Sequence, residues 1–145
     1  MSTLIGIDHG SRRIGVAVGD TETGMAFARA AIIRRNLEVD LAAIGVLVTA
    51  ESAKLVVIGL PLHVDGTEGD QAASARKFGE RLVDRGIPVA YEDERLSSWE
   101  AVERLVEAGR RPRRESGELD STAARLILQQ YLDARRSAGP PEESE

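Results

Sequence analysis

The stretch that most constrains the fold is residues 5–20, which read IGIDHGSRRIGVAVGD. An apolar run ends in a carboxylate, a short turn containing a glycine follows, and a second run alternates branched apolar residues with small ones. Alternation with a period of two predicts strands, and so short a connection predicts that the two strands return on each other as an antiparallel pair. The charged residues are unusual for such a pair of strands. Asp8 ends an apolar strand, and Arg12 and Arg13 follow in the turn after it.

The order of the remaining elements indicates the fold class. Further strands are expected at 25–35, 54–61 and 87–93, and helices are expected after Asn36 and at 71–86, 97–109 and 119–136. Parallel strands need a crossover connection, which is right-handed in nearly all proteins. Three strands followed by such units therefore predict an α/β fold with a mixed five-stranded sheet and helices on both of its faces.

Length and composition limit the number of domains, the kinds of metal site and the expected location of the protein. The chain has 145 residues, 42% of them hydrophobic, which suits one domain with a proper core. We place this domain at residues 1–138 and expect the acidic, proline-containing tail at 139–145 to be disordered. The lack of cysteine excludes thiolate metal sites. Because no signal segment and no apolar run of membrane-spanning length is found, we expect a cytoplasmic protein without a membrane partner.

The basic residues are nearly all arginines, and many of them come in pairs. The net charge is −5, so the chain as a whole is not basic. Most of the pairs are read as solvated surface charge, but RRPRR at 110–114 cannot easily form one face of a helix. We therefore expect a basic loop that binds nucleic acid, made by Arg110, Arg111, Arg113 and Arg114.

Carboxylates stand at the ends of three predicted elements. Asp8 closes the first strand, Asp93 and Glu94 close the last strand, and Asp120 opens the final helix. Clustered carboxylates raise one another's pKa and are stable together only with a cation between them. Oxygen ligands indicate Mg²⁺ or Mn²⁺, as one or two ions. Such a site suits phosphodiester hydrolysis, with Arg12 or Arg13 holding a phosphate of the substrate.

Four blocks in order resemble the YqgF/RuvX family, whose members are described as Holliday-junction-resolvase-like proteins and as pre-16S rRNA nucleases. The blocks are GIDHGSRRIGVA, VIGLPLHVDGTEG, DERLSSWEA and DSTAARLILQQYLD, and the resemblance spans about residues 4–133. It implies a ribonuclease-H-like fold and a metal-dependent endonuclease. The implied substrate is precursor ribosomal RNA, with branched DNA as the second choice. The family's acidic positions fall on Asp8, on the acidic pair before Arg95 and on Asp120.

Several points stay open at this stage. Successive strand residues face opposite sides, so we favour Glu94 as the ligand, with Asp93 in support as a partner of Arg95. Asp120 can also serve as the cap of its helix. His9 is expected to face away from Asp8 and to be structural. The alternatives to rRNA processing are a Holliday junction resolvase, a non-catalytic RNA-binding factor of ribosome assembly that acts on ribosomal particles, and a phosphotransferase of the actin-like superfamily. A monomer and a homodimer both fit.

Overall fold

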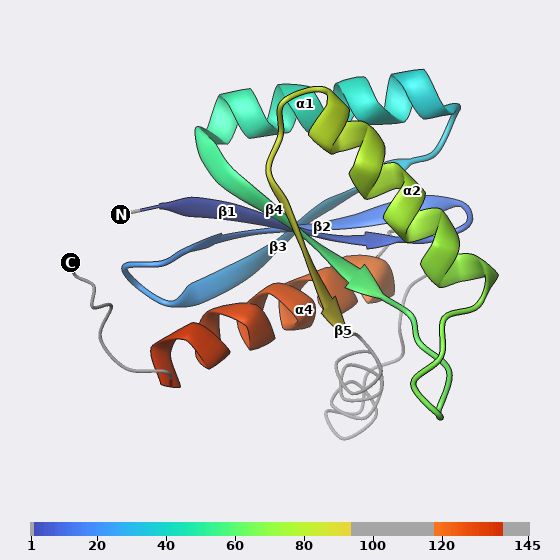
Figure 1. The fold of residues 1–145 in the computed structure, drawn as a ribbon. Coiled ribbons are helices and arrows are strands. Elements are labelled where there is room, and N and C mark those ends of the chain that lie inside the picture. The colour runs from blue at the N-terminus through green and yellow to red at the C-terminus, as the bar shows by residue number, and fades with distance from the viewer. Residues whose placement is uncertain (1, 94–117, 138–145) are drawn as a thin grey trace.

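The computed structural model describes residues 2–93 and 118–137, and these form a layered α/β fold (Figure 1). A five-stranded sheet has the order β3-β2-β1-β4-β5. The strands are β1 (Thr3–His9), β2 (Arg13–Asp20), β3 (Met25–Ile33), β4 (Ala53–Leu60) and β5 (Val89–Asp93). The helices are α1 (Leu37–Glu51), α2 (Asp70–Asp84) and α4 (Glu118–Ser137).

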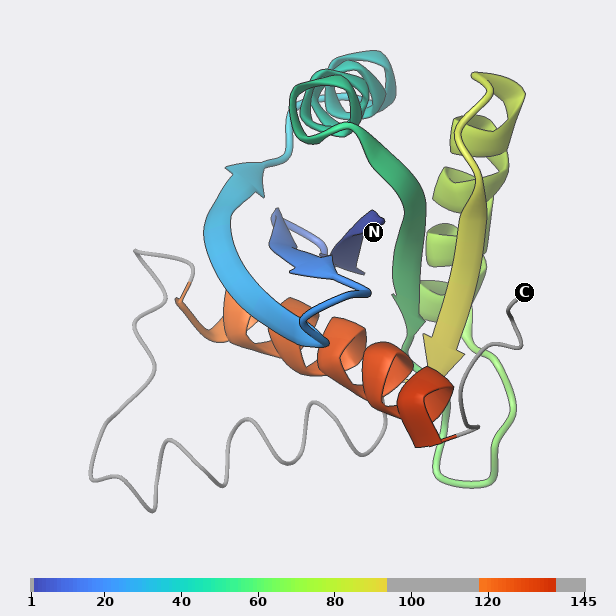
Figure 2. The ribbon, with the colours of Figure 1, turned by 90° about the vertical axis from the view of Figure 1, so that its left-hand side faces the viewer.

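Strand direction brings several chain segments to one edge of the sheet. β2 is antiparallel to both β1 and β3, whereas β1, β4 and β5 are mutually parallel. The carboxyl ends of β1, β4 and β5 therefore lie at the same edge, together with the β1–β2 turn and the end of β3. Figure 2 shows α1 and α2 on one side of the sheet and α4 on the other. The expected mixed sheet with helices on both faces is confirmed.

The larger core lies between the sheet and helices α1 and α2. The expected inward residues of α2 are all buried, namely Ala72, Ala75, Phe78 and Leu82. In α1, Leu41 and Ile44 are buried, while Leu37 at the helix start remains 38% exposed. The side chain of Asn36 accepts a hydrogen bond from Val39 N at 3.0 Å, so Asn36 caps α1 as expected.

Helix α4 closes the opposite face, and glycines allow it to come close. A Cβ atom on Gly6 of β1 would lie 2.8 Å from Leu128 Cβ and 3.1 Å from the carbonyl oxygen of Ala124. At its first turns, Ser121 Oγ donates to Arg29 O of β3 at 2.6 Å. Further along, the side chain of Gln129 binds backbone atoms at the start of β3. Helix α4 therefore runs antiparallel to β3, and its first turn lies toward the carboxyl end of the parallel strands.

Some expectations lie outside the described residues: the helix at 97–109, the basic loop at 110–114 and the acidic tail at 139–145. Within the described part of the chain, none of the helices combines the length and the apolar character needed to cross a membrane.

Candidate active site at the carboxyl edge of the sheet

Asp8 is the penultimate residue of the central strand β1 and is half-buried. Its side chain shares the α4 side of the sheet with Gly6, because strand residues alternate between the two faces. On the neighbouring strand β2 the residue opposite Asp8 is Gly15. On β4, Ile7 pairs with Ile58, so the next position along, Gly59, is level with Asp8. Two glycines thus flank Asp8, and neither position places a side chain beside its carboxylate.

His9 faces the other side of the sheet, as expected. Its ring lies against Phe78 of α2, with ring centroids 4.8 Å apart. Burial, reinforced by the nearby Arg34 guanidinium, lowers the pKa of His9 from 6.5 to about 4. The imidazole is therefore neutral at pH 7 and acts as a packing group, so the structural interpretation of His9 is confirmed.

The two arginines of the β1–β2 turn differ in their placement. Gly10 N donates to Arg13 O at 2.9 Å and closes the turn. Arg12 is exposed within the turn, whereas Arg13 is half-buried and begins β2. Arg13 is two residues before Gly15, so alternation puts it on the α4 side, which is also the side of Asp8. Of the two, Arg13 is the better placed to meet a phosphate bound at Asp8.

The end of β5 presents an acidic residue that the sequence reasoning missed. Tyr91 lies on the α2 side, so Glu92 faces α4, where Gln130 Nε2 donates to Glu92 Oε2 and, at 3.2 Å, to the carbonyl oxygen of Asp93. Glu92 pairs with Gly59 and is therefore level with Asp8, two strands away. The alternation of β5 starting from Val89 is the signal that could have found Glu92.

The same alternation directs Asp93, the last residue of β5, to the α2 side. Asp93 therefore faces away from the side that carries Asp8, as expected when Glu94 rather than Asp93 is preferred as the metal ligand. The preferred residue, Glu94, lies outside the described residues, as do Arg95 and the four arginines of the predicted basic loop.

Asp120 is placed by its backbone in the first turn of α4. It stands four residues, about one turn, before Ala124, whose carbonyl oxygen faces Gly6. Because α4 runs antiparallel to β3, and β3 has the direction of β1, the first turn of α4 lies toward the carboxyl end of β1. Among the described residues no group of three His, Cys, Asp or Glu side chains is close enough to hold a metal ion.

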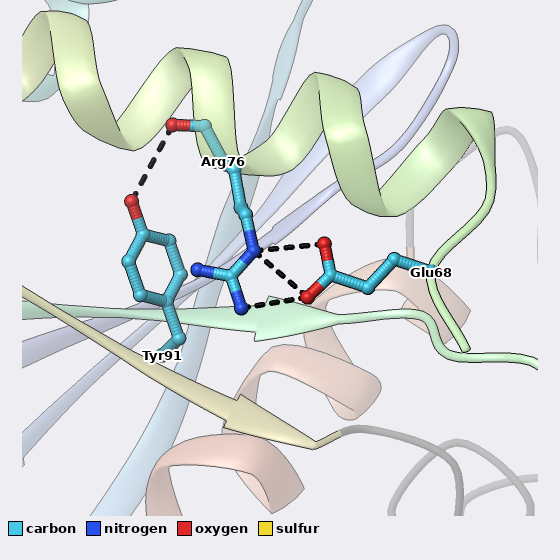
Figure 3. Close-up of polar contacts among 3 residues, drawn as sticks. All are labelled: Glu68, Arg76 and Tyr91. Atoms are coloured by element: carbon cyan, nitrogen blue, oxygen red, sulfur yellow. Dashed lines mark hydrogen bonds and ion pairs between the residues drawn. The ribbon is translucent and has the colours of Figure 1, made fainter. Parts of the chain in front are cut away.

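A clamp beside the site fixes the segment that joins β4 to α2 (Figure 3). Arg76 of α2 binds both carboxylate oxygens of Glu68, with donor–acceptor distances of 2.6–2.9 Å. Its guanidinium carbon also lies 4.9 Å from the centre of the Tyr91 ring, and Tyr91 Oη donates to Arg76 O at 3.4 Å. The bonds from Arg76 lower the pKa of Glu68, and burial raises the pKa of Tyr91. The clamp therefore links the connecting segment to α2 and β5.

Comparisons with solved structures find the same architecture in two proteins that were solved with Holliday junctions. Thermus thermophilus RuvC in complex with a Holliday junction superposes with a TM-score of 0.57 at 16% identity, covering 94% of this chain and 96% of RuvC. The Fowlpox virus resolvase bound to Holliday junction DNA gives a TM-score of 0.56 at 10% identity, covering 92% and 98%. At these identities the likeness shows the fold alone, and the expected ribonuclease-H-like fold is confirmed.

Sequence comparisons are more specific. A protein from Synechococcus sp. (strain PCC 6301) is 43% identical over 137 residues, covering 91% of this chain and 89% of the relative, and is named as a candidate pre-16S rRNA nuclease. A protein from Burkholderia ambifaria (strain MC40-6) has the same name and is 44% identical over 133 residues, with the same coverage. The profile described as "RuvX: Holliday junction resolvase" matches residues 2–134. The chain therefore belongs to the RuvX family.

Proposed function

We propose that this protein is a divalent-metal-dependent endonuclease that hydrolyses phosphodiester bonds in structured nucleic acid, with the 5′ end of precursor 16S rRNA as its substrate. The names of the relatives supply the substrate. The observation that carries the proposal is the setting of Asp8, at the carboxyl end of the central strand between Gly15 and Gly59, with the first turn of α4 directed toward the same end.

The chemistry of the proposed donors suits a hard divalent cation. Asp8, Glu94 and Asp120 would hold one or two Mg²⁺ or Mn²⁺ ions through carboxylate oxygens, the donors that these ions prefer. When bound, such ions would supply an activated water molecule for phosphodiester hydrolysis and would stabilise the leaving oxygen. The flanking glycines leave room on either side of the Asp8 carboxylate, and Glu92, held by Gln130, adds negative charge at the same level of the sheet.

The chain's own task is to hold the substrate in place. Arg13, on the Asp8 side, is suited to bind a phosphate oxygen of the strand that is cut. The proposed carboxylate ligands repel that strand when no metal is bound, so metal should strengthen binding at the site of cleavage, while the arginines bind the strand without it. The four arginines at 110–114 are proposed as a further grip on the substrate, and ribosomal particles are a natural context for it.

A cleavage assay tests the proposed function. Precursor 16S rRNA with a 5′ extension and a four-way DNA junction would each be offered with Mg²⁺, Mn²⁺ or EDTA. We expect metal-dependent cutting of the RNA that falls to background in Asp8→Asn, because the substitution removes a charged metal ligand. Asp84→Asn is the matched control, since Asp84 is an exposed residue at the end of α2. It should cut like the wild type.

The outcomes separate the candidate functions. Preference for the DNA junction would favour a resolvase, as the family description and the RuvC-like fold suggest. If the folded protein binds RNA but cuts neither substrate, even within ribosomal particles, the nuclease proposal is wrong. The assembly-factor function would then take its place.

A further inference from the structure

Two arginine pairs that are distant in sequence lie side by side at the edge that carries Asp8. Arg34 N donates to Arg12 O at 2.9 Å, and Arg13 pairs with Ile33 across the β2–β3 ladder. The β1–β2 turn and the segment between β3 and α1 therefore meet, and they bring Arg35 next to the turn. The pair Arg34 and Arg35 is one of the arginine pairs that the sequence alone predicts to be solvated surface charge.

The two members of this second pair have different surroundings. Arg34 is used internally, because its Nη1 donates to Gly10 O at 2.8 Å and its Nε lies 3.6 Å from Asp40 Oδ2. Arg35 contributes its backbone N–H, which donates to Asp40 Oδ1 at 3.0 Å, while the residue remains exposed. Arg34 thus serves the fold, and the guanidinium of Arg35 is available to a ligand.

Asp40 is the centre of this arrangement. It is only 1% exposed, and a buried carboxylate is costly unless it is paired and hydrogen-bonded. Its two oxygens bind Arg34 and the backbone of Arg35, and Arg34 in turn holds Gly10. One buried side chain of α1 therefore fixes both segments that carry the arginines.

Within the described residues, ion pairs do not neutralise the three guanidinium groups that gather at this edge. Across residues 2–93 and 118–137, no carboxylate forms an ion pair with Arg12, Arg13 or Arg35. Elsewhere, Arg29 pairs with Glu51, Arg76 with Glu68 and Arg85 with Glu38. Arg81, at the opposite edge of the sheet, likewise has no ion pair among the described residues, so Arg12, Arg13 and Arg35 are set apart by their gathering at one edge. In a chain with a net charge of −5, three guanidinium groups that gather beside the candidate active site, without ion pairs to any described residue, indicate a binding site for an anion.

We infer that Arg35 joins Arg12 and Arg13 to bind the phosphodiester backbone of the nucleic acid on the β2–β3 side of Asp8, with Arg34 and Asp40 as the positioning pair. This inference rests on the proposed function, since it gives the substrate strand a path along the carboxyl edge. The ligand chemistry is a row of phosphates, which guanidinium groups bind in bidentate fashion.

The test measures binding without cleavage. Fluorescein-labelled precursor-rRNA leader and a labelled four-way DNA junction would be titrated with protein in EDTA over a range of KCl concentrations. Arg35→Gln should lower the slope of log Kobs against log salt by about 0.7–0.9 and weaken binding roughly fivefold near 0.1 M KCl, as loss of one phosphate contact predicts. Thermal melting would check that the variant is folded.

Arg81→Gln is the matched control, because Arg81 is exposed in the last turn of α2, at the opposite edge of the sheet. It removes the same charge and should leave the slope unchanged. A slope for Arg35→Gln equal to that of the wild type, or equal losses in both variants, would overturn the inference. Comparison of the two ligands tells whether the site favours RNA or DNA.

The two proposals can fail separately. If the wild type cuts RNA with metal but Arg35→Gln binds normally, the phosphate site is wrong and the nuclease stands. If nothing is cut but Arg35→Gln still shows the reduced salt slope, the nuclease proposal is wrong and the binding site stands.

Discussion

A single missing side chain, at Gly6, sets how closely α4 can approach the central strand. Leu128 Cβ and the Ala124 carbonyl oxygen occupy the space that a Cβ would need. Gly6→Ala should therefore destabilise the fold by about 1–3 kcal/mol, as overpacking usually does. Urea denaturation measures the loss, and cleavage should fall as well, because α4 carries Asp120.

Gly45 in α1 is the natural control for this substitution. Apart from its chain neighbours and the backbone of its own helix, no atom lies within 4 Å of a Cβ built on it. Gly45→Ala should raise the free energy of unfolding by about 0.4–1 kcal/mol, because alanine has less conformational freedom in the unfolded chain. If Gly6→Ala were as stable as the wild type, α4 could shift without cost, and its fit against β1 would not position the site.

At the scale of elements, the clamp of Glu68, Arg76 and Tyr91 controls the segment between β4 and α2. Glu68→Gln removes the charge that Arg76 binds with both oxygens. The pair is exposed, so global stability should hardly change. The backbone amides of His63 and Gly66, whose hydrogen bonds close this segment, should exchange with solvent several-fold faster. Hydrogen exchange measures this directly.

Glu22→Gln in the β2–β3 turn serves as the control, since it removes an exposed glutamate far from the clamp. Unchanged exchange at His63 and Gly66 in Glu68→Gln would show that the segment holds its shape without the clamp.

Sequence patterns predicted the elements better than the contacts between them. The apolar spacing of α2 predicted its buried residues because a helix shows its inward face in a period of 3.6. Glu92 was missed because its partner, Gln130, is 38 residues away, and no local pattern reports such a tertiary hydrogen bond. The pairing of Arg34 with Asp40 was missed for a related reason, since the pattern of α1 did not show that a carboxylate on it is buried.

For the whole molecule, the uneven distribution of charge links metal binding to stability. The proposed ligands Asp8, Glu94 and Asp120 would repel one another at the carboxyl edge, and a bound cation would remove that cost. Mn²⁺ at about 100 times its Kd would then stabilise the protein by about 2.7 kcal/mol. For a domain of this size, that corresponds to a rise in Tm of roughly 5–10 °C.

The melting experiment compares the wild type, Asp8→Asn and Asp84→Asn with Mn²⁺ and with EDTA. The Tm of the wild type and of Asp84→Asn should rise with Mn²⁺, while that of Asp8→Asn should not. If Mn²⁺ raised the Tm of the wild type and of both variants equally, the ion would bind elsewhere on the protein and Asp8 would not be a ligand.

Because α4 is the last described element and packs on the first strand, the order of synthesis matters. While the ribosome is still making the chain, the sheet emerges before the helix that covers one of its faces. Until residues near Leu128 leave the exit tunnel, the apolar side chains of Leu4 and Val57 are not covered by α4. A partly translated chain therefore exposes an apolar sheet face and is prone to aggregate, and the fold of this nuclease is complete only when α4 has been made.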